Sequence, residues 1–437
     1  MPQVRAFRGI RYDLAHVGSL SDVVAPPYDV IGPDFQERLY KRHPCNVVRL
    51  ILNREEPGDG DENNRYTRAA RFLRNWMHEG VLMVESDPAL YVYDQVFEHA
   101  GQQYTRRGVM ARVKLERFGE GTIYPHEETY AGPKADRLKL MQATRANLSQ
   151  VFGIVPDASS ELSSALTKAV EGRPPLEAAD DLGVVHRMWV VTEIDYLQAI
   201  QRCLASEPTF IADGHHRYET ACHYRDLLAE QEGGLDPEHP ANYGLMMVVG
   251  MSDPGMIVLP THRVLRGIPA WSSDQLCARL SSAFEVSVTG DGPEAGGSIW
   301  NEIESAGDQH RMAFYAPADR RWVTAELTPD GASQMAELAS SRTAEWRGLG
   351  VAILHQLVLD HLLKLQDAPR PDYLHDVKEV VDLIDSNSQP PVGLAALVMP
   401  ATLDDIRVLS LQGERMPQKS TYFYPKLLSG LVINPLE

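Results

Sequence analysis

Apolar and polar positions along the chain change repeatedly between a period of two and a period of about 3.6, which predicts strands and helices in alternation. After a polar loop at 53–64, apolar residues recur at helical spacing on one face: Tyr66, Ala69, Ala70, Leu73, Trp76 and Met77. Two strand-like runs follow at 89–97 and 107–115, and the turn-prone sequence HAGQQ between them predicts a hairpin. The pattern therefore favours an α/β protein of the mixed α+β kind.

The alternation continues in the later part of the chain, with expected strands at 184–191 and 209–213, and expected helices at 192–206, after 214, and at 349–365. Residues 156–182 are rich in Ala, Ser, Asp, Glu and Pro, which predicts an exposed connecting segment. A second loop is expected at 286–297. We therefore divide the chain into an N-terminal α/β region at 1–155, a core at 156–290 and a C-terminal α/β region at 291–437.

Charge and composition disfavour several kinds of partner. The 437 residues include 42 Lys and Arg against 60 Asp and Glu, a net charge of −18. Such an acidic surface repels the phosphates of nucleic acids and the anionic lipids of membranes, so we expect a small-molecule ligand and no nucleic acid or membrane partner. Four cysteines without CxxC spacing and a start without an apolar leader predict a cytoplasmic location.

The sequence IADGHHRYET at 211–220 places polar, mostly ionisable side chains where an apolar strand meets a helix. The first N–H groups of that helix lack intrahelical acceptors and lie at the positive end of the helix dipole, so an anion is stabilised there. Arg217 adds a guanidinium fork suited to phosphate or carboxylate oxygens. His215 and His216 point about 100° apart on a helix, so only one of them easily faces such an anion. The alternative is that Asp213 simply caps the helix and the histidines are solvated.

A second polar stretch, YPHEETYAGPKADR at 124–137, combines an imidazole, carboxylates and two cations. His126 and Glu127 together supply proton-transfer or metal-binding capacity. Lys134 and Arg137, three residues apart at an expected helix start, would clamp an anion. The order HEE is not HExxH, so a zinc protease is disfavoured. A capped helix with a solvated, charged face is the alternative.

The stretch MPQKSTYFYPK at 416–426 contains one cation and two hydroxyls in a row: Lys419, Ser420 and Thr421. The chain contains no GxxxxGK sequence, so this is not a P-loop. In a proline-bracketed loop of a chain with a net charge of −18, the three residues are candidate anion contacts. Ordinary surface residues are the alternative.

The stretch VVAPPYDVI at 23–31 has two prolines that stiffen the chain and present Tyr28 and Asp29. A rigid turn anchored by a packed tyrosine explains Tyr28 without a ligand. Asp29 is a candidate contact for a metal or a substrate amine. We treat both residues as candidate substrate-binding positions.

Taken together, VAPPYDVI, the HEET stretch with its following cations, IADGHHRYETA and MPQKSTYFYPK resemble a widespread bacterial family of unknown function, over nearly the whole chain. The DGHHR segment is also similar to the signature of the ParB/sulfiredoxin-like superfamily, where it opens a phosphate-binding helix. That superfamily includes chromosome-partitioning proteins, sulfiredoxins and free-serine kinases. One departure is that Asn147-Leu148-Ser149 is followed by Gln150 where the family often has proline, which leaves the role of Ser149 open.

The second resemblance implies a ParB/sulfiredoxin-like core at 156–290, elaborated by the flanking α/β segments, and a small-molecule phosphotransferase. In its most specific form, this enzyme is a free L-serine kinase that uses pyrophosphate, ADP or ATP to form O-phosphoserine, with Mg²⁺ bridging donor oxygens. The implied donor-binding residues are Asp213, Gly214, His215, His216 and Arg217, with Lys134, Arg137, Lys419, Ser420 and Thr421. The implied catalytic residues are His126 and Glu127, with Glu127 accepting the hydroxyl proton.

Two other functions use the same residues. A ParB-like regulator would bind a nucleotide or nucleic acid at the DGHHR helix, but the net charge and the lack of a basic helix-turn-helix oppose it. A metal-dependent phosphohydrolase is the other, although two adjacent histidines on a helix make poor joint ligands. Its metal ligands would be His126, Glu127, His215 and His216. The donor, the acceptor and the oligomeric state stay open.

Overall fold

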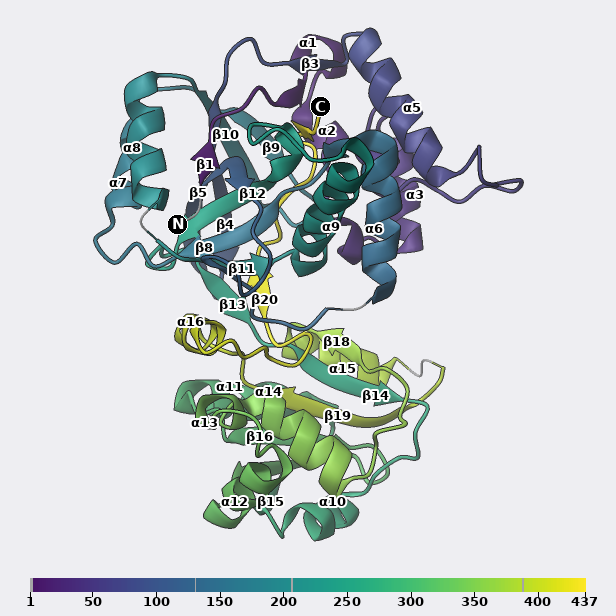
Figure 1. Ribbon diagram of the computed structural model, residues 1–437. Coiled ribbons are helices and arrows are strands. Elements are labelled where there is room, and N and C mark those ends of the chain that lie inside the picture. Colours follow the sequence, from purple (N-terminus) through teal and green to yellow (C-terminus); the bar gives the residue numbers. More distant parts are fainter. Residues whose placement is uncertain (1–2, 130, 206, 387–388) are drawn as a thin grey trace. The chain divides into compact units, whose positions relative to one another are not determined.

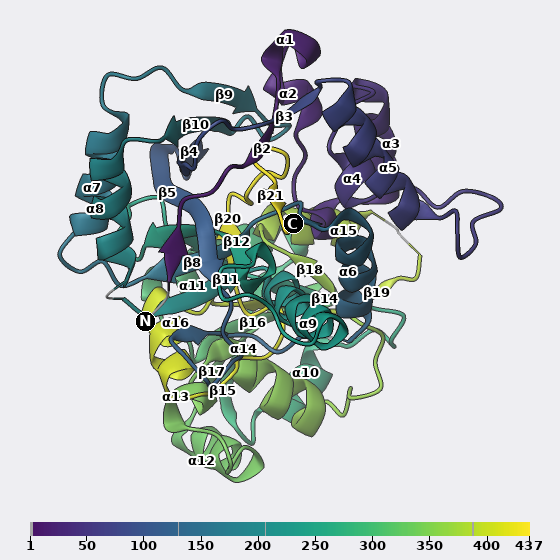
Figure 2. The same ribbon diagram turned by 45° about the horizontal axis from the view of Figure 1, so that its top comes forward.

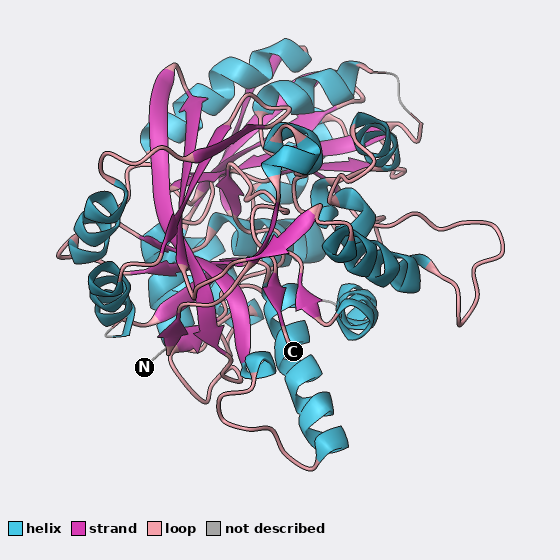
Figure 3. Ribbon diagram, turned by 90° about the horizontal axis from the view of Figure 1, so that it is seen from above, coloured by secondary structure: helices cyan, strands magenta, loops and turns pink. Residues whose placement is uncertain are grey.

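The computed structural model describes residues 3–129, 131–205, 207–386 and 389–437, and the chain forms two compact units. The first unit comprises Met1–Pro125, Thr129–Ile257 and Pro425–Glu437, and the second comprises His126–Glu128 and Val258–Tyr424. Each unit combines a β-sheet with helices (Figures 1 and 3). The predicted mixed α/β class is confirmed.

The first unit is built on a nine-stranded sheet in the order β6, β11, β8, β12, β5, β4, β10 and β9, with β1 also paired to β5. The strands are β1 Val4–Arg5, β4 Leu90–His99, β5 Gln102–Lys114, β6 Ile123–Tyr124, β8 Val151–Val155, β9 Leu176–Ala179, β10 Val185–Val191, β11 Thr209–Asp213 and β12 Tyr243–Gly250. β12 is parallel to β8 and β11 is parallel to β6, whereas the remaining pairs are antiparallel. Every residue of β12 is buried, as expected for a strand covered on both faces.

Helices cover one face of this sheet: α6 Ala131–Thr144, α7 Glu161–Val170, α8 Ile194–Ala205 and α9 His215–Glu232. Leu166 of α7, Leu204 of α8 and Tyr218 of α9 belong to one hydrophobic cluster with Val109 and the other inward residues of the strands. Figures 1 and 2 both show α7 beside α8 and α6 beside α9. The start of α9, which carries the DGHHR motif, is thereby fixed against the end of β11.

Residues 425–428 of the C-terminal segment lie on the opposite face of the same sheet, whereas Leu436 belongs to the helix-covered cluster. Val92 of β4 belongs to the helix-covered cluster. Because side chains alternate between the two faces along a strand, Gln95, three residues later, points to the other face. Gln95 Nε2 donates to the Lys426 carbonyl at 2.9 Å, and Gln150 Nε2 donates to the Leu428 carbonyl at 2.9 Å. The last residues of the chain therefore complete the core of the first unit.

The N-terminal part of the first unit confirms two predictions. The expected amphipathic helix is α5 Arg65–His78, with a capping box at Asn64 and with Leu73 and Trp76 buried. The expected hairpin is formed by β4 and β5. Ala100 and Gly101 at its turn both have positive φ, 50° and 75°, as a tight two-residue turn requires.

The second unit contains a six-stranded antiparallel sheet in the order β15, β17, β16, β19, β14 and β18. Its strands are β14 His262–Arg266, β15 Phe284–Asp291, β16 Arg311–Ala316, β17 Arg321–Leu327, β18 Asp372–Leu374 and β19 Val392–Val398. Its helices are α10 Ser273–Leu280, α11 Gly296–Ala306, α12 Pro329–Leu338, α13 Ala344–Arg347, α14 Gly350–Ala352, the π-helix η4 Ile353–Leu362, α15 Val377–Asp385 and α16 Leu403–Leu411. Trp300 of α11 and Val380 of α15 pack on one face of this sheet with Ala313 and Ala395.

The chain also contains short elements, listed with their bounds: β2 Ile10–Tyr12, α1 Leu14–Val17, α2 Leu20–Val23, η1 Tyr28–Val30, α3 Pro33–Arg42, α4 Val48–Ile51, β3 Leu82–Val84, β7 Ala146–Asn147, η2 Pro240–Asn242, β13 Ile257–Leu259, η3 Pro293–Ala295, β20 Tyr422–Tyr424 and β21 Asn434–Pro435. Within the described parts of the chain, no helix has the length and apolar character that a membrane span needs.

Two loop predictions are wrong. The segment 156–182 contains α7 and β9, and Leu162 and Leu166 of α7 are buried because the helical spacing of its few apolar residues outweighs its polar composition. The segment 286–297 contains most of β15 and the start of α11. β15 is an edge strand of the second sheet, and an exposed edge tolerates the polar and glycine residues that suggested a loop.

The units differ from the predicted regions 1–155, 156–290 and 291–437. The boundary after 155 falls at the end of β8, which pairs with both β11 and β12 inside one sheet. The boundary after 290 falls within β15, which is paired with β17. Strand pairing between segments far apart in the sequence decides the units, and composition along the chain does not report that pairing.

Candidate functional site

The predicted strand–helix junction is present in the first unit. β11 ends at Asp213, Gly214 is the N-cap, and α9 begins at His215. Gly214 has a φ of 90°, a left-handed conformation that glycine adopts easily, and a Cβ at this position would lie 2.9 Å from the Arg217 guanidinium. The glycine therefore permits the sharp turn and allows Arg217 to fold back over it.

Asp213 holds two cations at the start of α9. Its Oδ2 accepts a hydrogen bond from Arg217 Nη2 at 2.8 Å, and its Oδ1 accepts one from Lys426 Nζ at 3.2 Å. Arg217 Nη1 also donates to the Gln150 carbonyl. The N-cap position belongs to Gly214, and the Asp213 side chain holds Arg217 and Lys426. A carboxylate does not attract phosphate, so at an anion site Asp213 would both position these cations and compete with the anion for them.

A third cation, Arg106, lies in the same environment. It is fully buried, its Nε donates to Gln95 Oε1 at 3.1 Å, and its Nη2 donates to the Pro425 carbonyl. Burial lowers the pKa of Arg106 to about 10, and the nearby Asp213 opposes this effect, so the side chain is cationic at neutral pH. Arg217 from the first turn of α9, and Arg106 and Lys426 from distant segments of the chain, thus bring positive charge near Asp213.

The two histidines of the motif have different environments. His215 is buried with 6% exposure, whereas His216 is partly exposed. This difference agrees with the expectation that adjacent helical side chains point in different directions. Their assignment to a phosphate donor stays a prediction.

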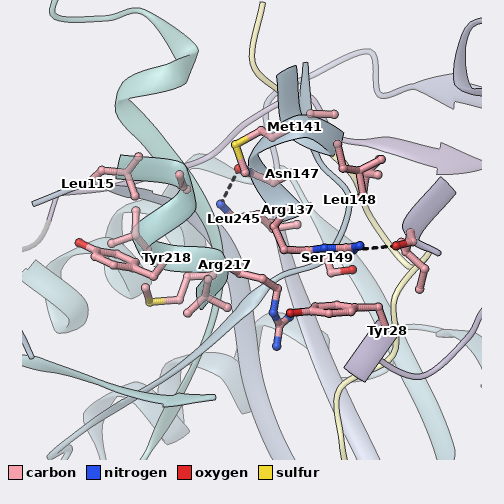
Figure 4. A pocket seen from close by; sticks show the side chains of 18 residues that line it. Tyr28, Leu115, Arg137, Met141, Asn147, Leu148, Ser149, Arg217, Tyr218 and Leu245 are labelled. Carbon is pink, nitrogen blue, oxygen red and sulfur yellow. Dashed lines mark hydrogen bonds between the residues drawn. The ribbon is translucent and has the colours of Figure 1, made fainter. Parts of the chain in front are cut away.

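A pocket of about 50 Å³ lies beside the junction in the first unit. Figure 4 shows the Arg217 guanidinium beside the hydroxyl end of Tyr28, and the Arg137 guanidinium over the Tyr28 ring. The guanidinium carbon of Arg137 lies 3.9 Å from the centroid of the Tyr28 ring. Arg137 also donates from Nη1 to the Ile51 carbonyl at 2.7 Å and from Nε to Asp136 Oδ2 at 2.7 Å. The pocket therefore has a rigidly held cationic and aromatic side.

Tyr28 and Asp29 lie on the same short turn, η1, but differ in exposure. Tyr28 lines the pocket, and burial raises the pKa of its phenol, so it stays protonated and can donate a hydrogen bond. Asp29 is exposed. Tyr28 is therefore both packed against Arg137, in agreement with the simpler explanation, and part of the pocket lining.

Lys134 contacts a carboxylate of the DGHHRYET motif. Its Nζ lies 3.2 Å from Glu219 Oε2, and the Thr129 hydroxyl donates to the same oxygen at 2.6 Å. Lys134 Nζ also lies 3.2 Å from Thr129 Oγ1. Lys134 and Arg137, both on α6, thus hold different partners, and a shared anion between them stays a prediction.

His126 and Glu127 belong to the second unit, where they meet the loop that contains Lys419, Ser420 and Thr421. Glu127 Oε1 accepts hydrogen bonds from the backbone N–H of Ser420 at 3.1 Å, from the backbone N–H of Thr421 at 3.2 Å, and from the Thr421 hydroxyl at 3.2 Å. His126 Nε2 lies 2.8 Å from Thr421 Oγ1. Successive amides that converge on one anion form a nest, and here a carboxylate of the same unit occupies it.

The shape of this loop is held by a buried arginine. Lys419 has a φ of 59°, and its carbonyl accepts from Arg263 Nη2 at 2.9 Å. Arg263 is 1% exposed, and burial lowers its pKa to about 10. The Ser420 hydroxyl donates to the Pro417 carbonyl. The left-handed residue and the buried arginine together turn the amides of Ser420 and Thr421 toward Glu127.

The predicted site residues therefore form two groups, one in each unit. The first unit contains Tyr28, Asp29, Lys134, Arg137, Asp213, Gly214, His215, His216 and Arg217. The second unit contains His126, Glu127, Lys419, Ser420 and Thr421. Direct contacts join Arg217 to Asp213 in the first group, and Glu127 to Ser420 and Thr421 in the second. The ligand roles of both groups stay predictions.

Sequence analysis missed four residues that shape these groups. Arg106 and Arg263 are charged residues at buried strand positions, a signal that alternation along a strand can reveal once the buried face is known. Lys426 and Glu219 lie inside motifs that we quoted, MPQKSTYFYPK and IADGHHRYET, but nothing in the local pattern indicates their partners.

The side chains that could bind a metal ion can be compared with the ligand sets that metal ions need. Among the described residues, no group of three or more His, Cys, Asp and Glu side chains could hold a metal ion. Asp213 also uses both of its oxygens on cations, so it does not fit a protein-held Mg²⁺. A Mg²⁺ ion carried by donor phosphates needs no such cage and stays a prediction.

The fold and the sequence define a mixed α/β protein of one family. Residues 4–352 match the family described as "Protein of unknown function (DUF1015)", and the chain belongs to this family. The resemblance to a family of unknown function is therefore confirmed. No curated protein matches the chain.

Several solved structures are similar at a low level. A free serine kinase in complex with AMP has a TM-score of 0.33 and 10% identity, covering 69% of this chain and 83% of its own. SbnI with a C-terminal truncation, from Staphylococcus aureus, has a TM-score of 0.34 and 10% identity, covering 75% and 87%. A conserved hypothetical protein from Pyrococcus furiosus has a TM-score of 0.32 and 11% identity, covering 70% and 90%. At these TM-scores and identities, the likeness establishes no shared activity.

Proposed function

We propose that the protein is a small-molecule phosphotransferase, with L-serine as the favoured acceptor and pyrophosphate, ADP or ATP as the donor. One observation supports it most: Arg106, Arg217 and Lys426 gather at Asp213 beside the start of α9, in a chain whose net charge is −18. Phosphoryl transfer depends mainly on alignment and on neutralisation of phosphate charge. A cationic junction at a helix N-terminus is suited to both.

In this proposal the junction binds the donor. Arg217 and Lys426 are held by Asp213 in the absence of ligand, and donor oxygens would share their N–H groups. Gly214 leaves room for the Arg217 guanidinium over the turn. The amides at the start of α9, with His215 and His216, would contact the same oxygens.

The transfer step forms a bond between the acceptor hydroxyl oxygen and phosphorus and breaks the bridging P–O bond of the donor. The resemblance to free-serine kinases assigns the released hydroxyl proton to Glu127. The three hydrogen bonds that this carboxylate accepts all reach Oε1, so we assign the proton to Oε2. His126 and the loop of Lys419, Ser420 and Thr421 would hold Glu127 in place.

The test is a transfer assay with the full chain. Labelled pyrophosphate, ADP and ATP are each combined with L-serine, with D-serine and with no acceptor, with and without Mg²⁺, and O-phosphoserine is measured by mass spectrometry. We expect phosphoserine to form with at least one donor. Nucleotide binding without transfer to any acceptor would instead support a nucleotide-binding regulator and would overturn the proposal.

A matched pair of variants ties the activity to the junction. Arg217→Lys keeps the charge but loses the planar fork, so we expect turnover to fall by about tenfold or more. Arg202→Lys makes the same change at an exposed position of α8 and should leave turnover unchanged. Equal activity of both variants would remove Arg217 from donor binding.

A further inference from the structure

The pocket beside the junction combines two cations with an apolar wall. Its cationic side is formed by Arg137 and Arg217. Its apolar wall comes from α6, α9, β12 and the segment 146–151, with these lining residues: Leu140, Met141, Leu148, Val151, Leu245 and Met246. Figure 4 shows Met141, Leu148 and Leu245 around the same space. No Asp or Glu is among the described residues that line it.

Two uncharged polar side chains of the lining, Asn147 and Ser149, already have partners. Asn147 Oδ1 accepts from the Leu245 backbone N–H at 3.0 Å and from Asn434 Nδ2 at 2.8 Å. Ser149 Oγ lies 2.7 Å from Ser429 Oγ. These bonds occupy the amide oxygen of Asn147 and engage the Ser149 hydroxyl. An ammonium group in the pocket would therefore meet cations and lose its water without gaining a carboxylate partner.

Hydrogen-bond donors, in contrast, are available in the lining of the pocket. Arg217 donates to Asp213 and to the Gln150 carbonyl, and Arg137 donates to Asp136 and to the Ile51 carbonyl. A guanidinium carries more N–H groups than these bonds use. The Tyr28 phenol, protonated because burial raises its pKa, adds a further donor. Each arginine is also ion-paired, Arg137 with Asp136 and Arg217 with Asp213, so the pocket offers an anion the N–H groups that these pairs leave unused.

We propose that this pocket binds a short-chain hydroxy monocarboxylate that lacks an α-ammonium group. The carboxylate would contact Arg137 and Arg217, and the aliphatic part would lie against Leu148 and Met246. This inference goes beyond the proposed function, because it assigns a second small-molecule site beside the junction and leaves L-serine as the favoured acceptor.

The size of the pocket limits the chain length of the ligand. A volume of about 50 Å³ is small, so we expect a short-chain acid there and not a nucleotide.

The test compares two ligands of the same length that differ in charge. Binding of 2-hydroxybutyrate and of 2-aminobutyrate to the full chain is measured by calorimetry and by NMR shift changes. We expect 2-hydroxybutyrate to bind at least about tenfold more tightly. Equal affinity, tighter binding of 2-aminobutyrate, or no binding of either acid would overturn the assignment.

Variants locate the binding. Ala221→Leu adds volume on α9, where Ala221 lines the pocket, and should abolish binding of 2-hydroxybutyrate. Ala229→Leu makes the same change on the same helix at a partly exposed position that does not line the pocket, and should bind like the unchanged chain. Helical circular dichroism checks that both variants fold. If Ala221→Leu folds and still binds the acid normally, the pocket is not its site.

These measurements separate the two proposals. Binding of the hydroxy acid needs no donor, so a chain that binds it but transfers no phosphoryl group would keep the pocket assignment and overturn the phosphotransferase. A chain that phosphorylates L-serine but does not discriminate against 2-aminobutyrate would keep the phosphotransferase and overturn the pocket assignment.

Discussion

The two groups of candidate residues stabilise charges of opposite sign. At the junction of the first unit, one carboxylate, Asp213, holds the cationic side chains of Arg217 and Lys426. In the second unit, backbone amides of Ser420 and Thr421 hold the carboxylate of Glu127. The first group depends on charged side chains, whereas the second depends on the backbone shape of a loop.

This difference indicates how each group should respond to change. Side-chain cations keep their charge when the local backbone shifts, but they need compensating carboxylates and hydrogen bonds when they are buried. A backbone nest keeps its donors under most substitutions of its own residues, but it fails when the loop loses its shape. Neutralising the carboxylate should therefore have different consequences in the two units.

The largest expected effect is on turnover, from Glu127→Gln. The amide oxygen of glutamine still accepts from Ser420 and Thr421, so the loop should persist, but the side chain no longer accepts a proton. We expect kcat to fall by about 100-fold to 10,000-fold with donor affinity nearly unchanged. The control is Glu128→Gln, a neighbouring and largely exposed residue, which should keep its kcat. An unchanged kcat in Glu127→Gln would remove the base assignment.

The next effect is on stability, from Arg106→Met. This change leaves Gln95 and the Pro425 carbonyl without their buried donor, so we expect the free energy of unfolding to drop by about 3 kcal/mol in urea titrations. Arg187→Met removes an arginine of the same sheet whose ion pair with Glu177 is exposed, and it should cost less than about 1 kcal/mol. Similar losses in the two variants would show that the Arg106 contacts are not the source of the effect.

The smallest effect, and the sharpest contrast with Glu127→Gln, is expected from Asp213→Asn. Removing the negative charge releases Arg217 and Lys426 toward an anion, so pyrophosphate should bind about threefold to tenfold more tightly at low salt. Isothermal titration at two ionic strengths measures this change. Weaker pyrophosphate binding in Asp213→Asn would mean that the carboxylate orients the cations more than it competes with the anion.

Much of the local structure could be predicted because it depends on neighbouring residues. The strand, turn and helix of IADGHHRYET follow from an apolar run, an Asp-Gly pair and helical spacing, and all three are present. The segments 156–182 and 286–297 contain helices and strands although their composition predicts loops. Apolar spacing and position in a sheet determine their structure more than composition does. The pairing of Glu127 with Ser420 spans 293 residues, and no local pattern reports a contact at that separation.

The amino-acid sequence by itself determined the acidic charge, the turn of the DGHHR motif, the starts of the main helices and the candidate anion-binding residues, since each depends on composition or on a few adjacent positions. Only the tertiary structure decided that Arg217 and Lys426 share the Asp213 carboxylate near the buried Arg106, and that a pocket with no Asp or Glu among its described lining residues lies beside them. The physical reason is that strand pairing and the return of the C-terminal segment bring these side chains together, and both depend on contacts between distant parts of the chain.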